Sequence, residues 1–354
     1  MTSLPGAQIS ALNGPIMITG HTGFKGAWLN LLLNRYGIPT IGYSLPPQKS
    51  SLCTMLMPKN QTIEFFGDIR DTISVDSFIK MYSPAAIIHL AAQPLVLESY
   101  RKPRETFDIN VMGTVNILES AFSNESVKAV LVVTTDKVYF NNNSDKSFIE
   151  TDPLRGKDPY SASKVGVESA VAAWQEVRQV FGGPKVVSLR AGNVIGGGDM
   201  AENRLLPDII RCFTDKRKLE LRNPNSTRPW QHVLDPLNGY LLALEAILAG
   251  NEIQTVNFGP SLDSLSVAEV AEVALKNWSI SGRVEVEFVN SPTISETTNL
   301  RLDSKLALET LGWSTKWTQI EAVTSTIKWW DLVLNEGLTA YEACQNDLDK
   351  LLLD

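Results

Sequence analysis

Short, mostly apolar runs alternate with helical patterns through the first half of the chain. The apolar runs are expected to be strands at 15–20, 39–44, 63–68, 85–92, 127–135 and 185–196, with helices at 24–37, 110–122 and 160–182. Strands without an alternating polar face are buried on both sides, as in a parallel sheet that helices cover on both faces. The pattern therefore predicts an α/β fold with a doubly wound parallel sheet.

The chain changes character after Gly198. Its segments become shorter and richer in proline, asparagine and arginine, and helical patterns follow at 234–249, 266–278, 303–311 and 318–335. A chain of 354 residues also exceeds what one small core organises. We therefore expect a sheet domain over 1–198 and a smaller, mostly helical domain over 199–354, with the chain crossing between the two.

The composition excludes several classes of protein. A net charge of −7 disfavours nucleic acid as a partner, because phosphate backbones bind basic surfaces. The three cysteines and three histidines lack metal-ligand spacing, so no metal site is expected. The N-terminal segment lacks the pattern of a signal peptide, and no apolar run is long enough to span a bilayer. We therefore expect a cytoplasmic protein without a membrane partner.

The segment GHTGFKG, residues 20–26, follows the first strand directly and opens the first helix. Glycines at such a turn let a diphosphate approach the backbone, and the helix N-terminus supplies free N–H groups with a partial positive charge. A tight turn alone would also explain the glycines, but the place at the start of a strand–helix–strand series favours a dinucleotide site. The sequence thus predicts a Rossmann-type domain whose loop binds a dinucleotide through Gly20, Thr22, Gly23, Phe24, Lys25 and Gly26.

Weaker signals bear on which dinucleotide is bound. An NAD site often has an acidic residue at the end of the second strand, but this strand ends with Ser44. No arginine adjoins Ser44 to hold the extra phosphate of NADP, and we expect NAD. Asp68 and Ile69 follow the third strand and are expected beside the adenine. Capping of the next helix is an equal alternative for Asp68.

Tyr160 and Lys164 are four residues apart in the long helix after the fifth strand, so they share one face of that helix. A nearby ammonium lowers the pKa of a phenol, and an oxidised nicotinamide ring would lower it further. Tyr160 would then accept a proton from a substrate alcohol near neutral pH, while Lys164 would also hold ribose hydroxyls. The fifth strand itself ends in the polar segment Thr134 to Lys137, which we expect in an active site.

Four segments in this order resemble the extended short-chain dehydrogenase/reductase family: GHTGFKG, HLAAQ (89–93), TTDKVY (134–139) and YSASK (160–164). The resemblance covers nearly the whole chain. RAGNVIGGGD (190–199) and RPWQHVLDPLNGYLLA (228–243) narrow it to the nucleotide-sugar 4,6-dehydratases, and within them to the members that act on CDP-glucose. It implies bound NAD, with further contacts from Leu90, Ala91, Ala92, Tyr160 and Lys164.

The resemblance also implies a reaction, in which CDP-glucose becomes CDP-4-keto-6-deoxyglucose and water through hydride transfer to and from NAD. Tyr160 would take the proton of the sugar 4-hydroxyl, and Thr135 would hydrogen-bond the 4-oxygen. Asp136 would protonate the departing C6 hydroxyl. Lys137 stands where the dTDP-glucose members carry glutamate and the CDP-glucose members carry lysine. Lys137 is either the base for the C5 proton or a cation that stabilises the enolate while another group takes this proton.

Five residues are expected to contact the substrate. Gln93 follows the fourth strand at its carboxyl end, where open α/β sheets bind ligands. Asn193 follows the sixth strand, and Arg204 and Arg228 are candidates for binding the phosphates. His232 is expected to line the nucleotide pocket. Surface ion pairs are the alternative role for the two arginines.

Two other functions share part of this pattern. A nucleotide-sugar epimerase or decarboxylase would have the glycine loop and the Tyr160–Lys164 pair, but it does not need Asp136 and Lys137 to expel a hydroxyl group. A non-catalytic dinucleotide sensor would not need a proton-transfer set. Relatives pair through two helices from each subunit, so we expect a homodimer or higher homo-oligomer formed by helices 99–122 and 160–181. The resemblance places the product in deoxysugar biosynthesis, as for lipopolysaccharide O-antigens.

Overall fold

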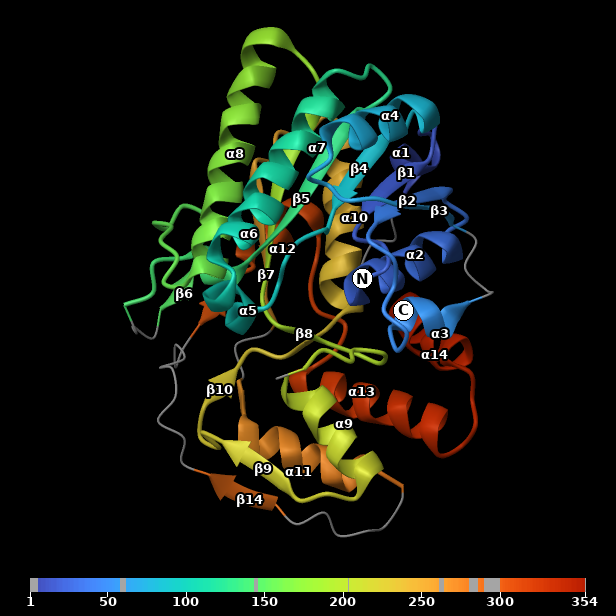
Figure 1. The fold of residues 1–354 in the computed structure, drawn as a ribbon, viewed down its shortest axis with the longest axis vertical. Coiled ribbons are helices and arrows are strands. Elements are labelled where there is room, and N and C mark those ends of the chain that lie inside the picture. Colours follow the sequence, from blue (N-terminus) through green and yellow to red (C-terminus); the bar gives the residue numbers. More distant parts are fainter. Residues whose placement is uncertain are drawn as a thin grey trace.

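The computed structural model describes residues 6–57, 62–142, 146–202, 204–260, 264–279, 286–289 and 300–353. A seven-stranded sheet forms its centre, with the order β12-β7-β5-β4-β1-β2-β3 and parallel pairing throughout (Figure 1). The strands are β1 (Ile16–Thr19), β2 (Thr40–Ser44), β3 (Ile63–Phe66), β4 (Ala86–His89), β5 (Ala129–Thr135), β7 (Lys185–Ala191) and β12 (Thr255–Phe258). The predicted α/β fold with a doubly wound parallel sheet is confirmed.

Helices cover both faces of this sheet. One face packs on α4 (Thr72–Tyr82), α7 (Gly113–Phe122) and α8 (Pro159–Phe181), and the other packs on α2 (Phe24–Arg35) and α10 (Leu234–Leu248). Along β5, Val130 and Val132 pack on the face covered by α4, α7 and α8, whereas Leu131 and Val133 pack on the face covered by α2 and α10. Burial on both faces explains why the sequence of this strand has no polar side.

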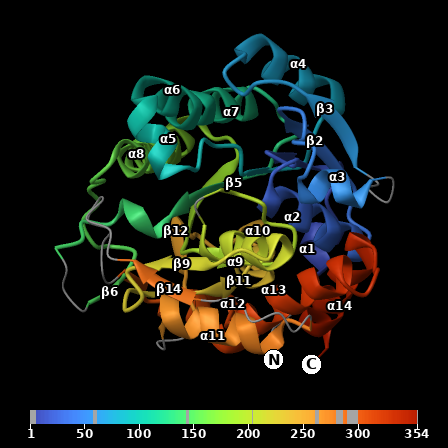
Figure 2. The same cartoon turned by 60° about the horizontal axis from the view of Figure 1, so that its bottom comes forward.

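A smaller lobe lies beyond the carboxyl ends of the central strands, as Figures 1 and 2 show from two directions. It contains α9 (Leu205–Asp215), α11 (Val267–Asn277), α13 (Gln319–Leu334), the parallel pair β9 (Leu219–Arg222) and β14 (Val286–Val289), and the antiparallel pair β10 (Thr227–Arg228) and β13 (Leu265–Ser266). The parallel pair β8 (Val194–Ile195) and β11 (Gln231–His232) lies where the chain enters and leaves this lobe.

Short elements complete the described structure. They are α1 (Ala7–Ser10), α3 (Leu52–Leu56), α5 (Val96–Arg101), α6 (Pro103–Phe107), the π-helical turn η1 (Asp108–Met112), the 3-10 turn η2 (Asp136–Val138), β6 (Ser147–Phe148), β15 (Arg301–Leu302), α12 (Lys305–Leu311) and α14 (Ala340–Leu352). The helix expected over 110–122 is therefore part of a longer helical stretch that begins at Pro103 and contains one π-helical turn. Among the described helices, none combines the length and apolarity that a membrane crossing requires.

The chain returns to the sheet after it has entered the smaller lobe. The helix α10 packs on the sheet, and β12 pairs in parallel with β7 as the edge strand. The strand expected over 185–196 ends at Ala191, since the backbone then leaves the sheet toward β8. A division of the chain into residues 1–198 and 199–354 therefore has to assign 234–258 to the first domain.

Candidate active site

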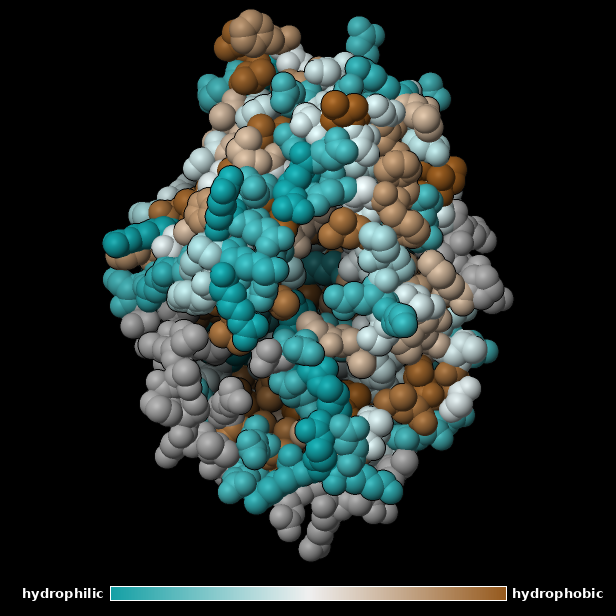
Figure 3. All heavy atoms as spheres, in the orientation of Figure 1, coloured by the Kyte–Doolittle hydropathy of each residue, from teal (hydrophilic) through white to brown (hydrophobic). Residues whose placement is uncertain are grey.

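The residues expected to be catalytic meet at the carboxyl end of β5. This strand ends at Thr135, and Asp136 begins the turn η2. Tyr160 and Lys164 lie in the first two turns of α8, whose start is fixed by a capping box between Asp158 and Ser161. The space-filling view shows a hollow in this region, between the sheet with its helices and the smaller lobe (Figure 3).

Thr135 links the two groups that we expect to move protons. Its hydroxyl donates to Asp136 Oδ1 at 2.9 Å and also hydrogen-bonds the side chain of Tyr160. Burial raises the pKa of Asp136, although the nearby Lys137 ammonium opposes this change. A carboxyl group with a raised pKa keeps its proton closer to neutral pH, as an acid catalyst requires. The structure thus brings Thr135, Asp136 and Tyr160 into one cluster.

The pKa of Tyr160 differs from the value expected from its spacing to Lys164. Burial raises the pKa of Tyr160 to about 12, and the Thr135 hydrogen bond opposes this only in part. The Lys164 ammonium donates to the Val133 carbonyl oxygen at 3.0 Å, and burial lowers the pKa of Lys164 to about 8. Lys164 therefore does not suffice to make a phenolate, and a base role for Tyr160 requires a further positive charge in the site.

The glycine loop has the shape that a dinucleotide diphosphate requires. Gly20 has a φ angle of +72°, and a Cβ atom there would lie 2.8 Å from the Ala91 backbone nitrogen. A Cβ atom on Gly26 would lie 2.2 Å from the Gly20 carbonyl oxygen. In the described chain no side chain caps the start of α2 at Gly23, so its N–H groups are available to an anion. These residues fit the diphosphate of NAD.

Lys25 lies in the first turn of α2 and reaches toward the catalytic cluster. Its Nζ atom donates to the Tyr240 hydroxyl at 3.4 Å. Burial lowers the pKa of Lys25 to about 7, and the charges of Arg204 and Lys164 contribute, whereas Asp136 opposes them. This residue, expected only at the cofactor, is thus also within electrostatic range of the reacting groups. Phe24 is the residue at which α2 begins.

Where we expect the adenosine of the cofactor, hydroxyl groups hydrogen-bond one another and the backbone. The Thr22 hydroxyl donates to the Leu45 carbonyl oxygen at 3.0 Å and lies 2.7 Å from the Ser44 hydroxyl. Asp68 pairs with Arg70 at 2.6 Å, which lowers the pKa of Asp68. The cap of α4 is Asp71, which accepts a hydrogen bond from the Ser74 N–H group. The capping alternative for Asp68 is therefore wrong, because the residue three positions later fills that role.

The end of β4 is shaped by hydrogen bonds within the chain. The backbone N–H groups of Leu90 and Ala91 both donate to the Thr19 hydroxyl at 3.2 Å. The Gln93 side chain donates to the Leu95 carbonyl and the Thr106 hydroxyl, and it accepts from the Leu95 N–H group at 2.6 Å. The amide of Gln93 is thus used to hold its own loop. Ile69 is buried, and Ala92 is half-buried beside Gln93.

The residues expected to bind the substrate do not all lie together. Arg204 begins α9, pairs with Asp199 at 2.9 Å, and its charge lowers the pKa of Tyr160 and of Lys25. Asn193 is half-buried in the segment between β7 and β8. Arg228 lies on β10 in the smaller lobe, where it donates to the Thr227 carbonyl oxygen. Arg204 is therefore the arginine that the structure places near the catalytic cluster.

His232 lies in the core instead of a pocket. Its side chain is fully buried and its ring stacks on Trp317 with 4.3 Å between the ring centres. Its Nε2 atom lies 3.4 Å from a carboxylate oxygen of Asp347 on α14. Because no part of this imidazole reaches the surface, we leave His232 out of the substrate site. A histidine in this segment suggested a nucleotide contact, but the burial of His232 depends on a C-terminal helix far away in the sequence.

A buried carboxylate next to the catalytic pair was not expected. Glu168 is four residues beyond Lys164 on α8 and is only 6% exposed. It accepts hydrogen bonds from Thr134, Ser188 and Arg190. The sequence did contain a signal, since Glu168 continues the four-residue spacing of Tyr160 and Lys164 on a helix face that otherwise enters the core.

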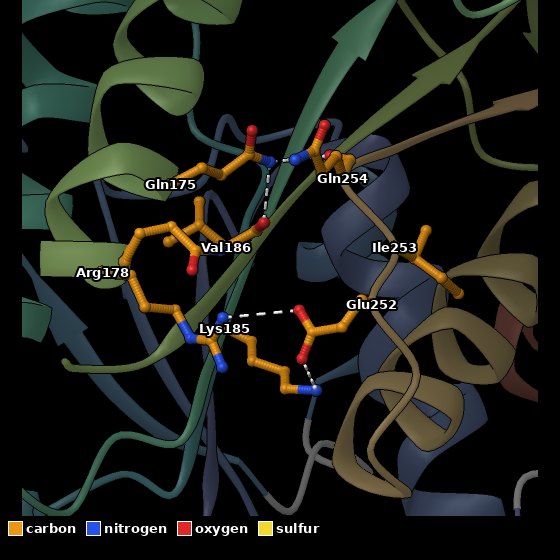
Figure 4. A pocket seen from close by; sticks show the side chains of 8 residues that line it. Gln175, Arg178, Lys185, Val186, Glu252, Ile253 and Gln254 are labelled. Carbon is orange, nitrogen blue, oxygen red and sulfur yellow. Dashed lines mark hydrogen bonds and ion pairs between the residues drawn. The ribbon is translucent and has the colours of Figure 1, made fainter.

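A separate pocket, away from the catalytic cluster, contains none of the residues expected to be catalytic. It lies at the amino end of β7 and is lined by side chains of α8 and of the segment before β12 (Figure 4). Glu252 binds Lys185 at 3.0 Å and Arg178 at 3.4 Å. The two cations thus share one carboxylate within the pocket, and we do not assign it a ligand.

Three comparisons relate this geometry to known proteins. The family model described as GDP-mannose 4,6 dehydratase matches residues 17–326. The chain is 38% identical over 326 residues to a CDP-glucose 4,6-dehydratase of Salmonella typhimurium, an alignment that covers 89% of each protein. It resembles a dTDP-glucose 4,6-dehydratase of Bacillus anthracis solved with NAD (TM-score 0.75, 21% identity, 91% and 98% coverage). It also resembles a UDP-glucose 4-epimerase of Brucella ovis solved with NAD (TM-score 0.78, 22% identity, 90% and 98% coverage).

Proposed function

The chain belongs to the GDP-mannose 4,6 dehydratase family, and we propose that it is an NAD-dependent CDP-glucose 4,6-dehydratase. Family membership confirms the resemblance to the nucleotide-sugar 4,6-dehydratases that the sequence indicated. The observation that carries the proposal is the cluster in which Thr135 joins Asp136 to Tyr160 at the carboxyl end of β5. The similarity to the Salmonella enzyme supports CDP-glucose as the substrate.

The residues around the glycine loop would hold NAD. The loop from Gly20 to Gly26 would bind its diphosphate, Thr22 and Ser44 would face the adenosine, and Lys164 would bind the nicotinamide ribose. When bound, NAD would supply the redox chemistry of the reaction, which is hydride transfer at C4 and C6 of the sugar. Its oxidised ring would also be the further positive charge that Tyr160 needs, because the pKa of Tyr160 beside Lys164 is about 12.

The protein side chains would carry the proton transfers. Tyr160 would accept the proton of the sugar 4-hydroxyl, while the Thr135 hydroxyl would orient the 4-oxygen. The 4-ketone makes the C5 proton acidic. A base then removes the C5 proton, and Asp136 gives a proton to the C6 hydroxyl, which leaves as water. The buried carboxyl group of Asp136 suits this step, because burial favours its protonated form.

Lys137 is either the C5 base or a cation that stabilises the enolate, and one experiment can exclude the base role. It lies beside Asp136, and its charge lowers the pKa of that carboxyl group. The Lys137→Met variant would be incubated with CDP-glucose in deuterated water, and deuterium at C5 would be measured by mass spectrometry. Loss of the exchange would show that removal of the C5 proton requires Lys137, in either of the two roles. Continued exchange would exclude the base role and leave Lys137 as a cation that stabilises the enolate.

The remaining polar residues of the site would bind the nucleotide sugar. We propose that Arg204 binds the diphosphate, since its charge already acts on Tyr160 and Lys25. Asn193 lies on the same side of the sheet, after the carboxyl end of β7. Arg228 would contact the nucleotide from the smaller lobe. Gln93 would act indirectly, because its amide holds the loop after β4.

A substrate panel tests the proposed function. The enzyme with NAD would be given CDP-, dTDP-, UDP- and GDP-glucose, and the mixtures would be made alkaline to reveal the near-ultraviolet absorbance of a 4-keto-6-deoxy sugar. We expect absorbance with CDP-glucose. An epimerase would instead yield a nucleotide galactose without this absorbance, and a sensor would leave every substrate unchanged. Absence of absorbance with all four substrates would refute the dehydratase assignment.

We further propose a homodimer in the cytoplasm that serves deoxysugar biosynthesis. The helices α6 to α8, expected at the interface, expose Phe107, Met112, Val180 and Phe181, with Phe181 83% exposed. Apolar side chains exposed on neighbouring helices are typical of a contact with another protein surface. Light scattering after size-exclusion chromatography would test this. A monomer at micromolar concentration would contradict the proposal, and Val180→Asp should weaken the dimer.

A further inference from the structure

Glu168 joins the catalytic helix to two strands of the sheet. Its carboxylate accepts from the Thr134 hydroxyl at 2.5 Å on β5 and from the Ser188 hydroxyl at 2.7 Å on β7. Arg190, also on β7, donates to both carboxylate oxygens, at 3.0 Å from Nε and 2.8 Å from Nη2. Four donors thus meet one side chain that is only 6% exposed. An ion pair of this kind is well compensated only when its geometry is this complete.

The partner Arg190 is anchored as well. Its Nη1 atom donates to the Tyr139 hydroxyl at 2.8 Å and to the Glu150 carbonyl oxygen at 2.9 Å. The Tyr139 hydroxyl in turn donates to Asn257 on β12 at 2.7 Å. The network therefore reaches from α8 across β5 and β7 to the edge strand. It also fixes the segment that follows Asp136 along the chain.

Lys164 is fixed at the same strand end. Its ammonium donates to the Val133 carbonyl oxygen, one residue before the Thr134 hydroxyl that donates to Glu168. Lys164 and Glu168, which are one helical turn apart on α8, thus form hydrogen bonds with two adjacent residues of β5. Two attachments at this spacing fix both the rotation of α8 and its position along the strand. Tyr160, one further turn toward the N-terminus, is placed by the same geometry.

The effect of Glu168 on the pKa of Lys164 depends on the other charged and titratable groups nearby. Lys25 from α2 adds a like charge, and His89 from β4 is neutral, because burial and Lys164 lower the pKa of His89 to about 3. The charge of Asp136 raises the pKa of Tyr160, and the charge of Arg204 lowers it. Burial lowers the pKa of Lys164, and the charge of Glu168 is the cause that opposes it.

We propose that Glu168 is a positioning residue for the proposed dehydratase reaction, a buried carboxylate that fixes α8 against the end of β5, where Lys164 is bound, and that balances the charge of Lys164 from one helical turn away. Without it, Lys164 would be a buried ammonium beside Lys25, with a carbonyl oxygen as its hydrogen-bond partner. Such a group would lose its proton near neutral pH, and the site would then lose the cation that supports Tyr160. This inference rests on the proposed function for its catalytic meaning, but not for its test.

The test measures the titration of Lys164 in the protein without NAD or substrate. Lysine would be labelled with ¹³C at Cε, and the Lys164 signal would be assigned by its absence in Lys164→Met. We expect the midpoint in Glu168→Gln to fall by about one pH unit, the lower end of the shift that a nearby opposite charge produces. Glu176→Gln is the matched control, since Glu176 lies exposed on the same helix, and it should leave the midpoint unchanged.

A second variant covers the case in which Glu168→Gln does not fold. Glu168→Gln combined with Arg190→Met removes both charges of the buried pair, a change that proteins often tolerate. If the network acted on structure alone, this folded double variant would titrate like the wild type, and that result would overturn the proposal. Because the double variant also removes the positive charge of Arg190, we expect its midpoint to fall by less than that of Glu168→Gln, and we expect the midpoint to recover in Glu168→Asp, which keeps the carboxylate.

A kinetic measurement then connects the inference to catalysis. The alkaline limb of kcat/KM against pH should move downward in the same variants by a similar amount, because it reports the proton on Lys164 in the free enzyme. A shift of the titration without any dehydratase activity in the wild type would refute the proposed function while leaving the role of Glu168 intact. An unshifted titration in an active enzyme would refute the role of Glu168 alone.

Discussion

Charged groups lie at both ends of the strands β5 and β7, and the two ends differ in how far these groups are exposed to solvent. At the amino end of β7, Lys185 and Arg178 pair with Glu252, which is 67% exposed (Figure 4). At the carboxyl end of β5, Asp136 and Lys164 are nearly fully buried, 3% and 6% exposed. Charges in water need no special partners, whereas buried ones do. The comparison indicates that reactivity in this molecule comes from burial with incomplete pairing.

The pKa values follow the same division. At the exposed end, the Lys185 ammonium lowers the pKa of Glu252 and so favours its usual charged form. At the buried end, burial moves Asp136, Tyr160 and Lys164 toward their neutral forms. The shifts of Asp136 and Lys164 bring their pKa values closer to neutral pH, as a general acid or base requires, whereas the pKa of Tyr160 moves away from neutral pH and needs the further positive charge in the site. The following variants test this division, beginning with the largest expected effect.

Removal of the Tyr160 hydroxyl should have the largest effect. Tyr160→Phe leaves no group to accept the proton of the sugar 4-hydroxyl, and we expect kcat to fall by at least about 10³-fold. The alkali absorbance assay with CDP-glucose would measure this loss. Tyr100→Phe is the matched control, because Tyr100 is 50% exposed on α5, and it should retain wild-type activity. Near-normal turnover by Tyr160→Phe would contradict the assignment of Tyr160 as the base.

Asp136→Asn should separate oxidation from elimination. The amide keeps the size of the side chain but cannot protonate the C6 hydroxyl, so we expect product formation to fall by roughly 10²–10³-fold. Tyr160 is intact in this variant, and oxidation at C4 should continue. The absorbance of reduced nicotinamide should therefore accumulate after CDP-glucose is added. Product at the wild-type rate would mean that another group is the acid.

Lys164→Met should inactivate the enzyme but stabilise the fold. The pKa of Lys164 falls from its ordinary value of 10.5 to about 8, which corresponds to a cost of about 3 kcal/mol for keeping the buried ammonium charged. Because the folded-state pKa is the lower one, this cost is fully present below pH 8. It disappears as the pH rises through 8 to 10.5, where the folded protein releases the proton before the unfolded chain does.

Urea unfolding at several pH values would measure this effect. Met at position 164 should raise the free energy of unfolding at pH 7 by up to about 3 kcal/mol, less the lost hydrogen bond to Val133, and the gain should shrink above pH 8. Lys185→Met is the control at the other end of the sheet. A gain that did not depend on pH would show that packing, and not the charge, was responsible.

Local sequence patterns predicted much of the fold. Unbroken apolar runs indicated the strands, the loop Gly20–Gly26 placed the first helix, and the four-residue spacing placed Tyr160 and Lys164 on one helix face. All of these depend on residues near one another in the chain. The return of β12 to the sheet edge was expected only as a crossing of unspecified position, since a four-residue strand carries little signal of its own.

The parts of the site that the sequence did not reveal depend on distant neighbours. His232 is buried because Trp317 and Asp347 surround it, and neither lies near it in the sequence. Asp71 displaced Asp68 as a helix cap because α4 begins three residues later than the strand pattern suggested. The role of Glu168 likewise required β5 and β7 to be placed side by side. The roles of these residues depend on contacts made in the folded structure, which the residue type alone does not specify.

The smallest effect is expected at the exposed end of the sheet. Glu252→Ala removes the carboxylate that Lys185 and Arg178 share, but both cations keep partial contact with water, and Lys185 also keeps its hydrogen bond to the Asn251 carbonyl oxygen. We therefore expect kcat/KM to be unchanged and the unfolding midpoint to stay close to that of the wild type, with any difference reduced further by added salt. Glu168→Ala makes the same chemical change at the buried end, where it leaves Arg190 uncompensated and should cost about 3–5 kcal/mol. Similar losses of stability in both variants would show that burial does not separate the two ends of these strands.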